Sequence, residues 1–403
     1  MQKLNTFLIL WFCLLAFSSC QDEQRDDNQS ILIADLDNVQ VCKKENLSSF
    51  FKRVGVIVLE TTEQSLLGRI DKIDFINDYL YVLERRRGLF LFNKNGKFIK
   101  MIGDKGVGPG EYISPSDITV DYENKKIYLL DSQTQMILKY DIEGNYEQSF
   151  KLKNKKKVCK RIQYFDNRIY TDLYSFDKSD DVYLLCEMNA KNGKDRVYSL
   201  DASKYNKGWN ELFNTEQQTF ISQINKNPKF MQLFMDTIFE ITKEGLQPKI
   251  AIQSEYLVTD GFVKERKGKK NASEFYNELN SANKVYNVHN YIESDKYVCF
   301  KYFINNTAKT YIYNKVDSLG YIVECLADDL LYIDDIGMRP MTKFISYDEK
   351  YAYSIEMNSN FTRTLFLENI ENNKISSQVV GGDKLRMLKG EDNPIIVYYE
   401  FKH

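Results

Sequence analysis

Arg, Asp and Tyr residues at the ends of apolar segments are the best candidates for binding a ligand. Arg85, Arg86 and Arg87 directly follow the apolar segment at residues 80–84. A guanidinium holds a carboxylate or sulfate through two parallel hydrogen bonds, so Arg86, or Arg85 with Arg87, could bind an oxyanion. The other candidates follow comparable segments or lie in a polar loop: Asp131, Gln133, Asp172, Tyr174 and Arg339. These candidate residues together suit a ligand such as a sugar acid or a peptide. The alternative for the three arginines is that they form a solvated turn without a ligand.

Catalytic chemistry has little support in the residue types. The chain has 2 histidines, of which His289 is internal. A Ser-His-Asp triad would require His289, which could line a channel or be a hydrogen-bonded structural residue. Paired carboxylates for glycoside cleavage, and calcium held by oxygen ligands from several loops, stay open because sequence spacing does not reveal such convergence. We expect no cofactor, with calcium as the alternative, and assign no catalytic residue.

Two other patterns are less specific. Residues 103–110 (GDKGVGPG) are rich in glycine, but they lack the Gly-Lys-Ser/Thr ending of a phosphate loop and precede a predicted strand, which indicates a turn. Basic runs at residues 151–161 and 264–270 could bind acidic polymers. However, 55 Lys and Arg nearly balance 57 Asp and Glu, for a formal net charge of −2. We therefore expect solvated strand edges and no nucleic-acid partner.

The beginning of the chain indicates export. Lys3 precedes an almost unbroken apolar run at residues 7–17, and two serines precede Cys20. This pattern is typical of a secretory signal peptide, and its ending resembles the lipobox of bacterial lipoproteins, whose cysteine is lipidated after cleavage. We predict a signal peptide at residues 1–19, lipidation at Cys20, and a flexible tether and lead-in at residues 20–49. The membrane is then a partner through the lipid anchor, and a plain signal peptide is the alternative.

An internal repeat sets the expected architecture. Residues 80–84 (LYVLE) align with residues 127–131 (IYLLD) at an offset of 47. In each unit an apolar strand ends in an acidic residue, and a polar turn, a second strand, a hairpin turn such as the Asn-Gly pair at 95–96, and a third strand follow. Leading strands at residues 70–75 and 116–120 complete four strands per unit. Four antiparallel strands at this spacing predict a β-propeller blade.

Weaker copies of the repeat extend the pattern to six units. They lie at residues 167–200, 236–252, 295–314 and 350–367. In the last copy, a strand at residues 350–356 is predicted to pair with one at residues 363–367. We predict an all-β fold, a six-bladed β-propeller of four-stranded antiparallel blades with a short helical insertion, formed by residues 50–403. The 28 Tyr and 25 Phe residues are then expected to pack mainly between blades.

Some segments are expected to close the ring or to lie outside the repeat. Residues 54–59 and 394–401 are apolar strands without a full blade around them. At least one should complete a blade supplied by the other terminus, which removes an exposed strand edge. Residues 205–234 and 262–285 do not follow the repeat and are predicted insertions. Within the second, residues 272–282 have helical spacing and predict a short amphipathic helix.

Particular motifs resemble a known family. Those at residues 103–112 (GDKGVGPGEY), 236–240 (DTIFE), 328–340 and 391–397 (EDNPIIV) are similar to motifs of the six-bladed β-propeller lipoproteins common in Bacteroidetes, which are akin to NHL-repeat propellers. The resemblance covers residues 50–402 and implies the propeller fold. The acidic stretch after the lipobox resembles the surface-export signal of lipoproteins in this group. The family thus implies an outer-membrane address, facing the cell surface or the periplasm, and no established activity.

The leading hypothesis is a surface-anchored propeller that acts as a binding or scaffold module. Its ligand would be a glycan, a peptide or a protein partner, bound at the funnel that the loops of one face form. The alternative is a propeller enzyme of the lyase, lactonase or glycosidase type, which would use channel carboxylates with or without calcium. A third hypothesis is an envelope assembly component without a small-molecule site. The scarcity of histidine favours binding, and the sequence does not indicate the oligomeric state.

Overall fold

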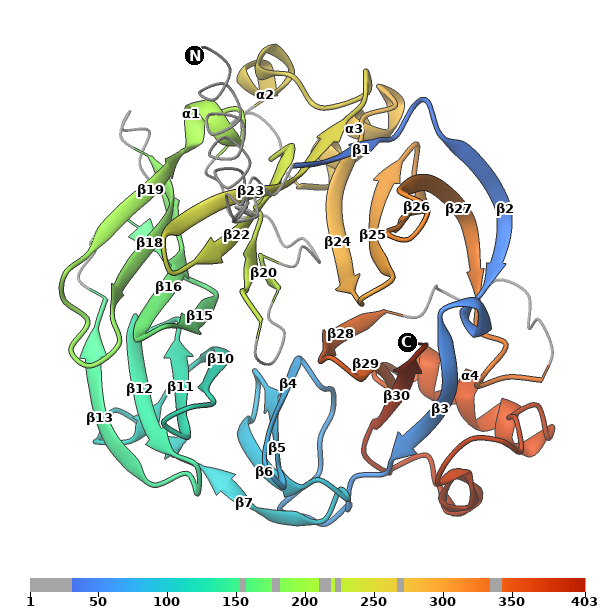
Figure 1. Cartoon of the computed structure of the whole chain (residues 1–403). Helices are drawn as coiled ribbons and strands as arrows, with labels where there is room; N and C mark the ends of the chain where they lie inside the picture. Colours follow the sequence, from blue (N-terminus) through green and yellow to red (C-terminus); the bar gives the residue numbers. More distant parts are fainter. Residues whose placement is uncertain are drawn as a thin grey trace, which may run out of the picture.

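Six small β-sheets follow one another around a common axis (Figure 1). The computed structural model describes residues 31–152, 157–175, 182–209, 219–221, 226–266, 272–333 and 343–402. In this part of the chain each of the six sheets has four or five strands, most of them antiparallel, which confirms the predicted six-bladed β-propeller. We number the blades 1 to 6 in chain order.

Blades 1 to 3 each have four antiparallel strands. Blade 1 contains β4 (Lys72–Ile76), β5 (Tyr79–Glu84), β6 (Gly88–Asn93) and β7 (Phe98–Ile102). Blade 2 contains β10 (Pro115–Asp121), β11 (Lys126–Asp131), β12 (Met136–Asp141) and β13 (Tyr146–Lys151). Blade 3 contains β15 (Ile162–Phe165), β16 (Arg168–Asp172), β18 (Tyr183–Asn189) and β19 (Val197–Asp201). Two-residue ladders join β8 (Asp104–Lys105) to β9 (Glu111–Tyr112) and β14 (Lys157–Val158) to β17 (Tyr174–Ser175).

Blades 4 and 5 each have a fifth strand from the N-terminal part of the chain. Blade 4 contains β20 (Phe220–Ile221), β21 (Lys229–Phe230), β22 (Thr237–Thr242) and β23 (Gly245–Gln253), and β1 (Leu32–Asp35) pairs with β23 in parallel. Blade 5 contains β24 (Tyr286–Glu293), β25 (Tyr297–Ile304), β26 (Thr307–Asn314) and β27 (Leu319–Ala327), and β2 (Gln40–Asn46) pairs with β27 in parallel. The stretch expected to be a tether and lead-in up to residue 49 therefore covers the outer edges of two blades from residue 32 onward.

Blade 6 closes the ring with strands from both ends of the chain. It contains β28 (Phe344–Tyr347), β29 (Tyr351–Glu356), β30 (Ile395–Phe401) and, on the outside, β3 (Phe51–Ile57). In the ladder between β3 and β30, Gly55 lies opposite Tyr398, and a Cβ at Gly55 would come within 2.3 Å of the Tyr398 ring. The prediction that a terminal strand completes a blade is confirmed. The ring is thus closed by pairing of β3 from the N-terminal part with β30 from the C-terminal part of the chain.

Helices occupy connections rather than blades. They are α1 (Ala202–Tyr205), α2 (Asp260–Arg266), α3 (Ala272–Ser281) and α4 (Asn360–Glu371), with short 3-10 helices at Leu47–Ser49 and Gly382–Met387. The predicted amphipathic helix is α3, which buries Phe275 and Leu279 on one side. Two expectations were wrong. The strand expected at residues 363–367 lies within α4, because Ser359 and Thr362 form a capping box that starts a helix there. The expected insertion at residues 205–234 contains β20 and β21, whose two residues each are too short to show a strand pattern.

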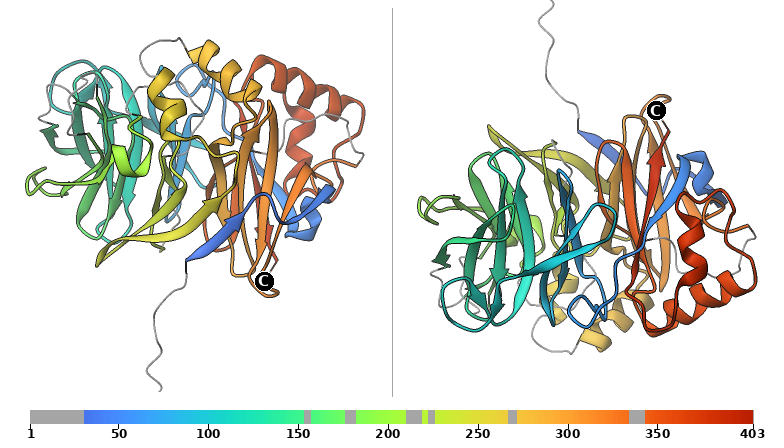
Figure 2. Two further views of the ribbon diagram at one scale, coloured as in Figure 1. Left: turned by 90° about the horizontal axis from the view of Figure 1, so that it is seen from above. Right: turned by 90° about the horizontal axis from the view of Figure 1, so that it is seen from below.

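The alternation of strand directions places two kinds of connection on the same face. The turns between the second and third strands of a blade lie on one face. The connections from the fourth strand of one blade to the first strand of the next lie on the same face. This face carries α2 and α3, and we call it the helix-bearing face. Both views in Figure 2 show these helices on one face, and the start of β1 and the C-terminus toward the other. The turn after β5, with Arg85 to Arg87, belongs to the helix-bearing face.

Aromatic side chains fill the spaces between blades, as the composition predicted. The rings of Tyr128 and Tyr164 stack between blades 2 and 3 with centroids 5.5 Å apart, and Phe75 packs on Tyr353 between blades 1 and 6 at 4.8 Å. Large side chains that are almost completely buried include Tyr81, Tyr112, Tyr140, Phe90 and Phe92. Burial of such rings against two neighbouring sheets is the main source of hydrophobic stabilisation in a ring of blades.

Candidate functional site

The acidic residue that ends the second strand of a blade holds the incoming connection in place. Glu84 accepts a hydrogen bond from the backbone N–H of Gly68 at 3.1 Å. Asp131 accepts the N–H groups of Ile113 (2.7 Å) and Ser114 (3.2 Å), as well as those of two residues in its own turn. The repeat of strand, acid and turn in the sequence therefore has a structural cause. Asp131 is buried and both of its oxygens are occupied, so it is not positioned to contact a ligand.

Asp172 has the same role in blade 3 but is only half satisfied. Its Oδ1 accepts the backbone N–H groups of Lys160 at 2.7 Å and Arg161 at 2.8 Å. Its Oδ2 is buried and accepts no hydrogen bond from the described residues. Burial raises the pKa of Asp172 to about 6, against the opposing effect of the two N–H groups and the Arg161 charge. The neighbouring Tyr174 hydroxyl is also buried, and desolvation together with the Asp172 charge raises its pKa.

The three arginines after β5 point in different directions. The Nε of Arg85 donates to the carbonyl oxygen of Ser116 in blade 2 at 2.9 Å, so this side chain crosses from blade 1 to blade 2. Arg86 is exposed. The guanidinium of Arg87 lies 5.4 Å from the centroid of the Phe90 ring, a cation–π contact within its own blade. Of the three, Arg85 is the one that reaches the neighbouring blade.

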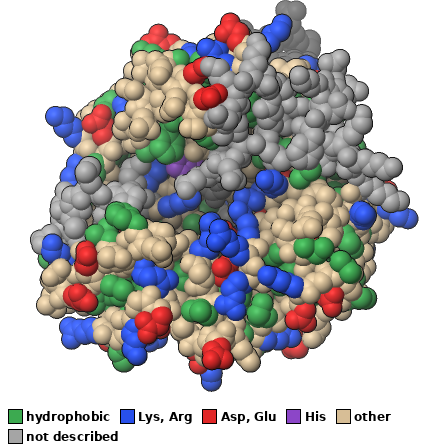
Figure 3. All heavy atoms as spheres, turned by 180° about the vertical axis from the view of Figure 1, so that it is seen from behind, with side chains coloured by type: hydrophobic (Ala, Val, Ile, Leu, Met, Phe, Trp, Pro, Cys, Tyr) green, Lys and Arg blue, Asp and Glu red, His purple; other side chains and the backbone are tan. Residues whose placement is uncertain are grey.

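Arg85, Lys160 and Arg161 form a cluster of like charges that we call the cation triad. Burial and the nearby Arg161 lower the pKa of Arg85. Burial, Arg161 and Arg85 lower the pKa of Lys160, although Asp172 opposes this. Arg161 donates from Nη1 to the carbonyl oxygen of Lys160 at 2.9 Å. On the helix-bearing face, Lys and Arg side chains gather around a central hollow, with a histidine at its edge (Figure 3).

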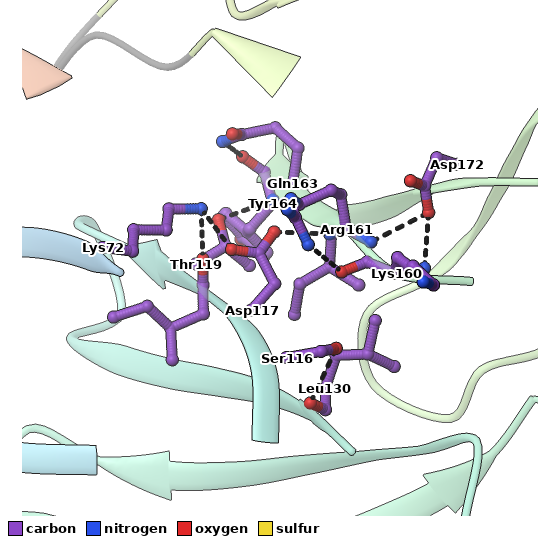
Figure 4. Close-up of polar contacts among 12 residues, drawn as sticks. Lys72, Ser116, Asp117, Thr119, Leu130, Lys160, Arg161, Gln163, Tyr164 and Asp172 are labelled. Carbon is purple, nitrogen blue, oxygen red and sulfur yellow. Dashed lines mark hydrogen bonds and ion pairs between the residues drawn. The ribbon is translucent and has the colours of Figure 1, made fainter. Parts of the chain in front are cut away.

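A second set of polar contacts lies beside the triad and links the inner strands of three blades (Figure 4). Lys72 on β4 donates from Nζ to Asp117 Oδ1 at 2.9 Å and to the carbonyl oxygen of Ile118 at 2.6 Å. Asp117 Oδ2 accepts the N–H of Ile162 on β15, and Thr119 Oγ1 accepts the N–H of Tyr164, both at 2.9 Å. Asp117 thereby fixes the positions of blades 1, 2 and 3 around the hollow.

Asp74, also on β4, is a buried carboxylate with an unusual protonation equilibrium. Its Oδ1 accepts the hydroxyl of Tyr122 at 2.5 Å and the N–H of Phe75 at 3.0 Å. Burial raises the pKa of Asp74 to about 6, although the Tyr122 hydrogen bond and the Lys72 charge act in the opposite direction. Desolvation raises the pKa of Tyr122 as well. Asp74 is thus a buried group with a pKa of about 6, and the Lys72 charge that acts on it is also paired with Asp117.

His289 is buried in blade 5. Its Nδ1 lies 2.7 Å from the carbonyl oxygen of Asn287, and its ring stacks on Phe303 with centroids 5.4 Å apart. Asn287 and Asn290, on either side of it, have φ values of +53° and +54°, and the β24 ladder is irregular at both places. These contacts fit a histidine held by a hydrogen bond and an aromatic ring. The strained backbone around it is the unusual feature of this strand.

The remaining predicted site residues are dispersed or lie outside the described residues. Gln133 is exposed in the turn after β11. Cys20 lies within residues 1–30 and Arg339 within residues 334–342, both outside the part that the structure describes. Of the predicted set, Arg85 belongs to the triad, and Asp172 and Tyr174 lie next to it.

Comparison with known proteins identifies the family. A family model described as a domain of unknown function, DUF4934, matches residues 31–400. The chain belongs to the DUF4934 family. No curated protein matches it significantly. Among solved structures, a protein of Bacteroides fragilis NCTC 9343, whose name suggests export, is 20% identical with a TM-score of 0.68, and the match covers 93% of this chain and 100% of the other.

A second solved structure supports the same fold for this DUF4934 member. It is a member of the DUF4221 family from Bacteroides vulgatus ATCC 8482, 10% identical with a TM-score of 0.50, and the match covers 87% of this chain and 97% of the other. At these identities the likeness concerns the fold alone. The resemblance to NHL-repeat propellers stays a prediction.

Sequence reasoning missed several residues that build the site of the DUF4934 propeller. Lys160 and Arg161 belong to the basic run that we expected to be a solvated strand edge, and Lys72, Asp74 and Asp117 were not considered. A usable signal was present for the last three, because a charged residue inside an apolar inner strand is rarely buried without a partner. For the two cations in the connection, nothing in the run distinguished them from their exposed neighbours.

Other features of the DUF4934 chain set the context of the site. A small pocket between blades 4 and 5 is bordered by Lys207, Asp236 and Asn287, and the Lys207 Nζ lies 3.0 Å from Asp236 Oδ2. Among the described residues no group of three or more His, Cys, Asp or Glu side chains could hold a metal ion, and the calcium that the sequence left open stays a prediction. A search of the same residues found no helix with the length and apolar character needed to cross a membrane.

Proposed function

We propose that this protein is a lipid-anchored binding module that holds a polar, anionic ligand at the hollow of its helix-bearing face. The observation that carries the proposal is the cation triad. Among the described residues, neither Lys160 nor Arg161 has a carboxylate oxygen within 4.0 Å, and Arg85 lies at that limit from Asp71. Partly buried cations that repel one another are costly for the folded protein unless they serve a ligand.

The proposed location, anchored by a lipid to the outer membrane, is supported by the sequence and by the fold. The apolar run before Cys20 and the two preceding serines fit a lipoprotein signal. The structurally similar Bacteroides fragilis protein has a name that suggests export. The described chain starts toward the face opposite the helices (Figure 2). An anchor at Cys20 would therefore leave the helix-bearing face accessible to a ligand, on either the cell-surface side or the periplasmic side of the outer membrane.

The anchor can be tested by membrane fractionation of cells that express the full chain. We expect the wild-type protein in the outer-membrane fraction and Cys20→Ala in the soluble fraction or still carrying its signal peptide. Ser19→Ala, which keeps a small residue before the cysteine, serves as the matched control. Retention of a fully processed Cys20→Ala protein in the membrane would refute the lipid anchor. Digestion of intact cells with added protease then distinguishes the cell surface from the periplasm.

The binding function can be tested with the mature chain and a panel of neutral and acidic glycans and peptides. We expect binding of at least one anionic compound and recovery of that compound unchanged after prolonged incubation. Conversion of the bound compound to a product would instead support the enzyme alternative, in which channel carboxylates act on a glycan or lactone. Absence of binding to every compound in the panel, with a folded protein, would favour an assembly role.

A further inference from the structure

We propose that Arg85, Lys160 and Arg161 form an oxyanion site that takes one carboxylate or sulfate group of an acidic glycan. This inference rests on the proposed function and names the ligand class for the same hollow. Arg85 comes from the turn after β5 in blade 1, and the other two from the connection between blades 2 and 3. Arg85 is bonded to Ser116, and the next residue, Asp117, is bonded to Ile162, which follows Arg161. Two separate segments thus bring guanidinium and ammonium groups close together.

The triad is held in position by contacts that do not use up its charge. Arg85 and Arg161 each donate to a carbonyl oxygen, of Ser116 and of Lys160 respectively, both at 2.9 Å. The backbone N–H groups of Lys160 and Arg161 are fixed by Asp172. A carbonyl contact orients a guanidinium but leaves further N–H donors for a ligand, because arginine has five. The site is therefore preorganised for an acceptor with several oxygens.

The charge balance around the triad limits how many anionic groups it can take. Lys72 is paired with Asp117 at 2.9 Å and Arg69 with Asp71 at 2.6 Å, so these cations are already compensated. Among the described residues, Lys160 and Arg161 have no carboxylate oxygen within 4.0 Å, although the charge of Asp172 acts on both. Together with Arg85, these cations match one sulfate or one or two carboxylates. A dense polyanion would also face the neighbouring carboxylates, which repel it.

The surroundings of the triad favour a sugar over a peptide. The side chains beside it are polar and hydrogen-bonded, among them Asp117, Thr119 and Gln163 (Figure 4). An apolar pocket of the described chain lies elsewhere, between blades 5 and 6, next to Phe50 and Phe344. Peptide recognition usually needs an apolar pocket or a free strand edge for side chains and backbone. A hydroxyl-rich ring that carries an acid group needs only polar partners.

The experiment compares acidic and neutral ligands on wild-type protein and three single variants. Isothermal titration would use sodium sulfate, a galacturonic acid trimer, a sulfated disaccharide, a neutral glucose trimer and an acidic hexapeptide. The variants are Lys160→Gln, Arg161→Gln and, as a matched control, Lys384→Gln, which removes an exposed charge in blade 6. All three keep the backbone N–H groups, so the contacts with Asp172 remain. Thermal melts establish that each variant is folded.

We expect one of the acidic sugars to bind, and Lys160→Gln and Arg161→Gln each to weaken it at least tenfold, with no change for Lys384→Gln. Binding of the galacturonic acid trimer would identify a carboxylate as the bound group, and binding of the sulfated disaccharide would identify a sulfate. Equal affinity of all variants for the acidic sugar would overturn the oxyanion site, and so would tighter binding of the acidic peptide than of either sugar. Binding of the acidic peptide alone would leave the proposed binding of an anionic ligand standing and refute this inference, whereas binding of the neutral trimer alone would refute both.

Discussion

Lys72 Nζ lies 2.9 Å from Asp117 Oδ1, while the second oxygen of the same carboxylate accepts the backbone N–H of Ile162 at the same distance. One side chain in blade 2 therefore binds the inner strands of the blades on both sides. Contacts of this kind matter in a propeller because each blade otherwise touches its neighbours mainly through apolar side chains, which constrain register less than hydrogen bonds do.

Replacing Asp117 should destabilise the protein substantially. Asp117→Ala leaves the Lys72 ammonium and the Ile162 N–H without a partner in a largely buried place, so we expect a loss of about 2–3 kcal/mol in the free energy of unfolding. Urea denaturation followed by tryptophan fluorescence measures it. The control is Asp78→Ala, which breaks the exposed pair with Lys94 and should cost less than about 0.5 kcal/mol. Equal losses for the two variants would contradict the role given to Asp117.

Replacing Asp172 should change how stability depends on pH. The pKa of Asp172 is raised from 3.8 to about 6 in the folded protein. The folded state therefore binds the proton more tightly than the unfolded chain, and this contribution to stability is present below the lower value and lost as the pH rises through the higher one. Asp172→Asn keeps an oxygen for the two N–H groups and cannot ionise.

We expect Asp172→Asn to gain stability relative to wild type as the pH rises from about 4 to about 7, by at most about 3 kcal/mol. Chemical denaturation at several pH values gives the difference directly. Asp131→Asn is the comparison, because both oxygens of Asp131 accept N–H groups. A difference between Asp172→Asn and wild type that stays constant with pH would show that Asp172 is not a buried group of raised pKa.

The same group should make oxyanion binding depend on pH. Asp172 titrates near pH 6 beside Arg161 and Lys160, with Arg85 and Asp117 facing them from blades 1 and 2. Protonation removes a negative charge from the site, so sulfate, which stays dianionic, should bind about threefold to tenfold more tightly at pH about 5.5 than at pH about 7.5. Titration calorimetry at the two pH values measures it. The ratio should fall to near one in Asp172→Asn, and an unchanged ratio would assign the effect to another group such as Asp74.

The hairpin glycine that the repeat predicted should be intolerant of substitution. Gly96 has a φ of +87°, and a Cβ there would come within 2.1 Å of the carbonyl oxygen of Val58. Gly96→Ala should cost about 2–4 kcal/mol, because it adds backbone strain and a contact with main chain that cannot move aside. Gly245 has a φ of +115° and open space around it, so Gly245→Ala adds backbone strain without a steric contact. This variant should lose about 1 kcal/mol in the free energy of unfolding. Gly390→Ala, which has neither feature, should leave the stability nearly unchanged. Thermal melts of the three variants and the wild type measure these differences.

Local patterns in the sequence were enough for the regular blades. In blades 1 and 2 the alternation of apolar residues, the hairpin glycines and the acidic strand ends all act within about 50 residues of chain, so the repeat and its strands were correctly predicted. Blade 4 was harder, because β20 and β21 have two residues each. The parallel pairing of β1 with β23 joins segments about 220 residues apart, and no local pattern specifies it.

The candidate site divides in the same way. The sequence by itself determined that Arg85 follows, and Asp172 ends, the second strand of a blade. Both therefore lie on one face of a ring, because strand alternation is a local property. Only the tertiary structure decided that Arg85 turns toward blade 2 and that both oxygens of Asp131 accept backbone N–H groups. It also decided that Lys160 and Arg161 have no carboxylate oxygen within 4.0 Å among the described residues. Whether a charge is paired depends on distances between blades that are remote in sequence, and those distances arise only when the ring closes.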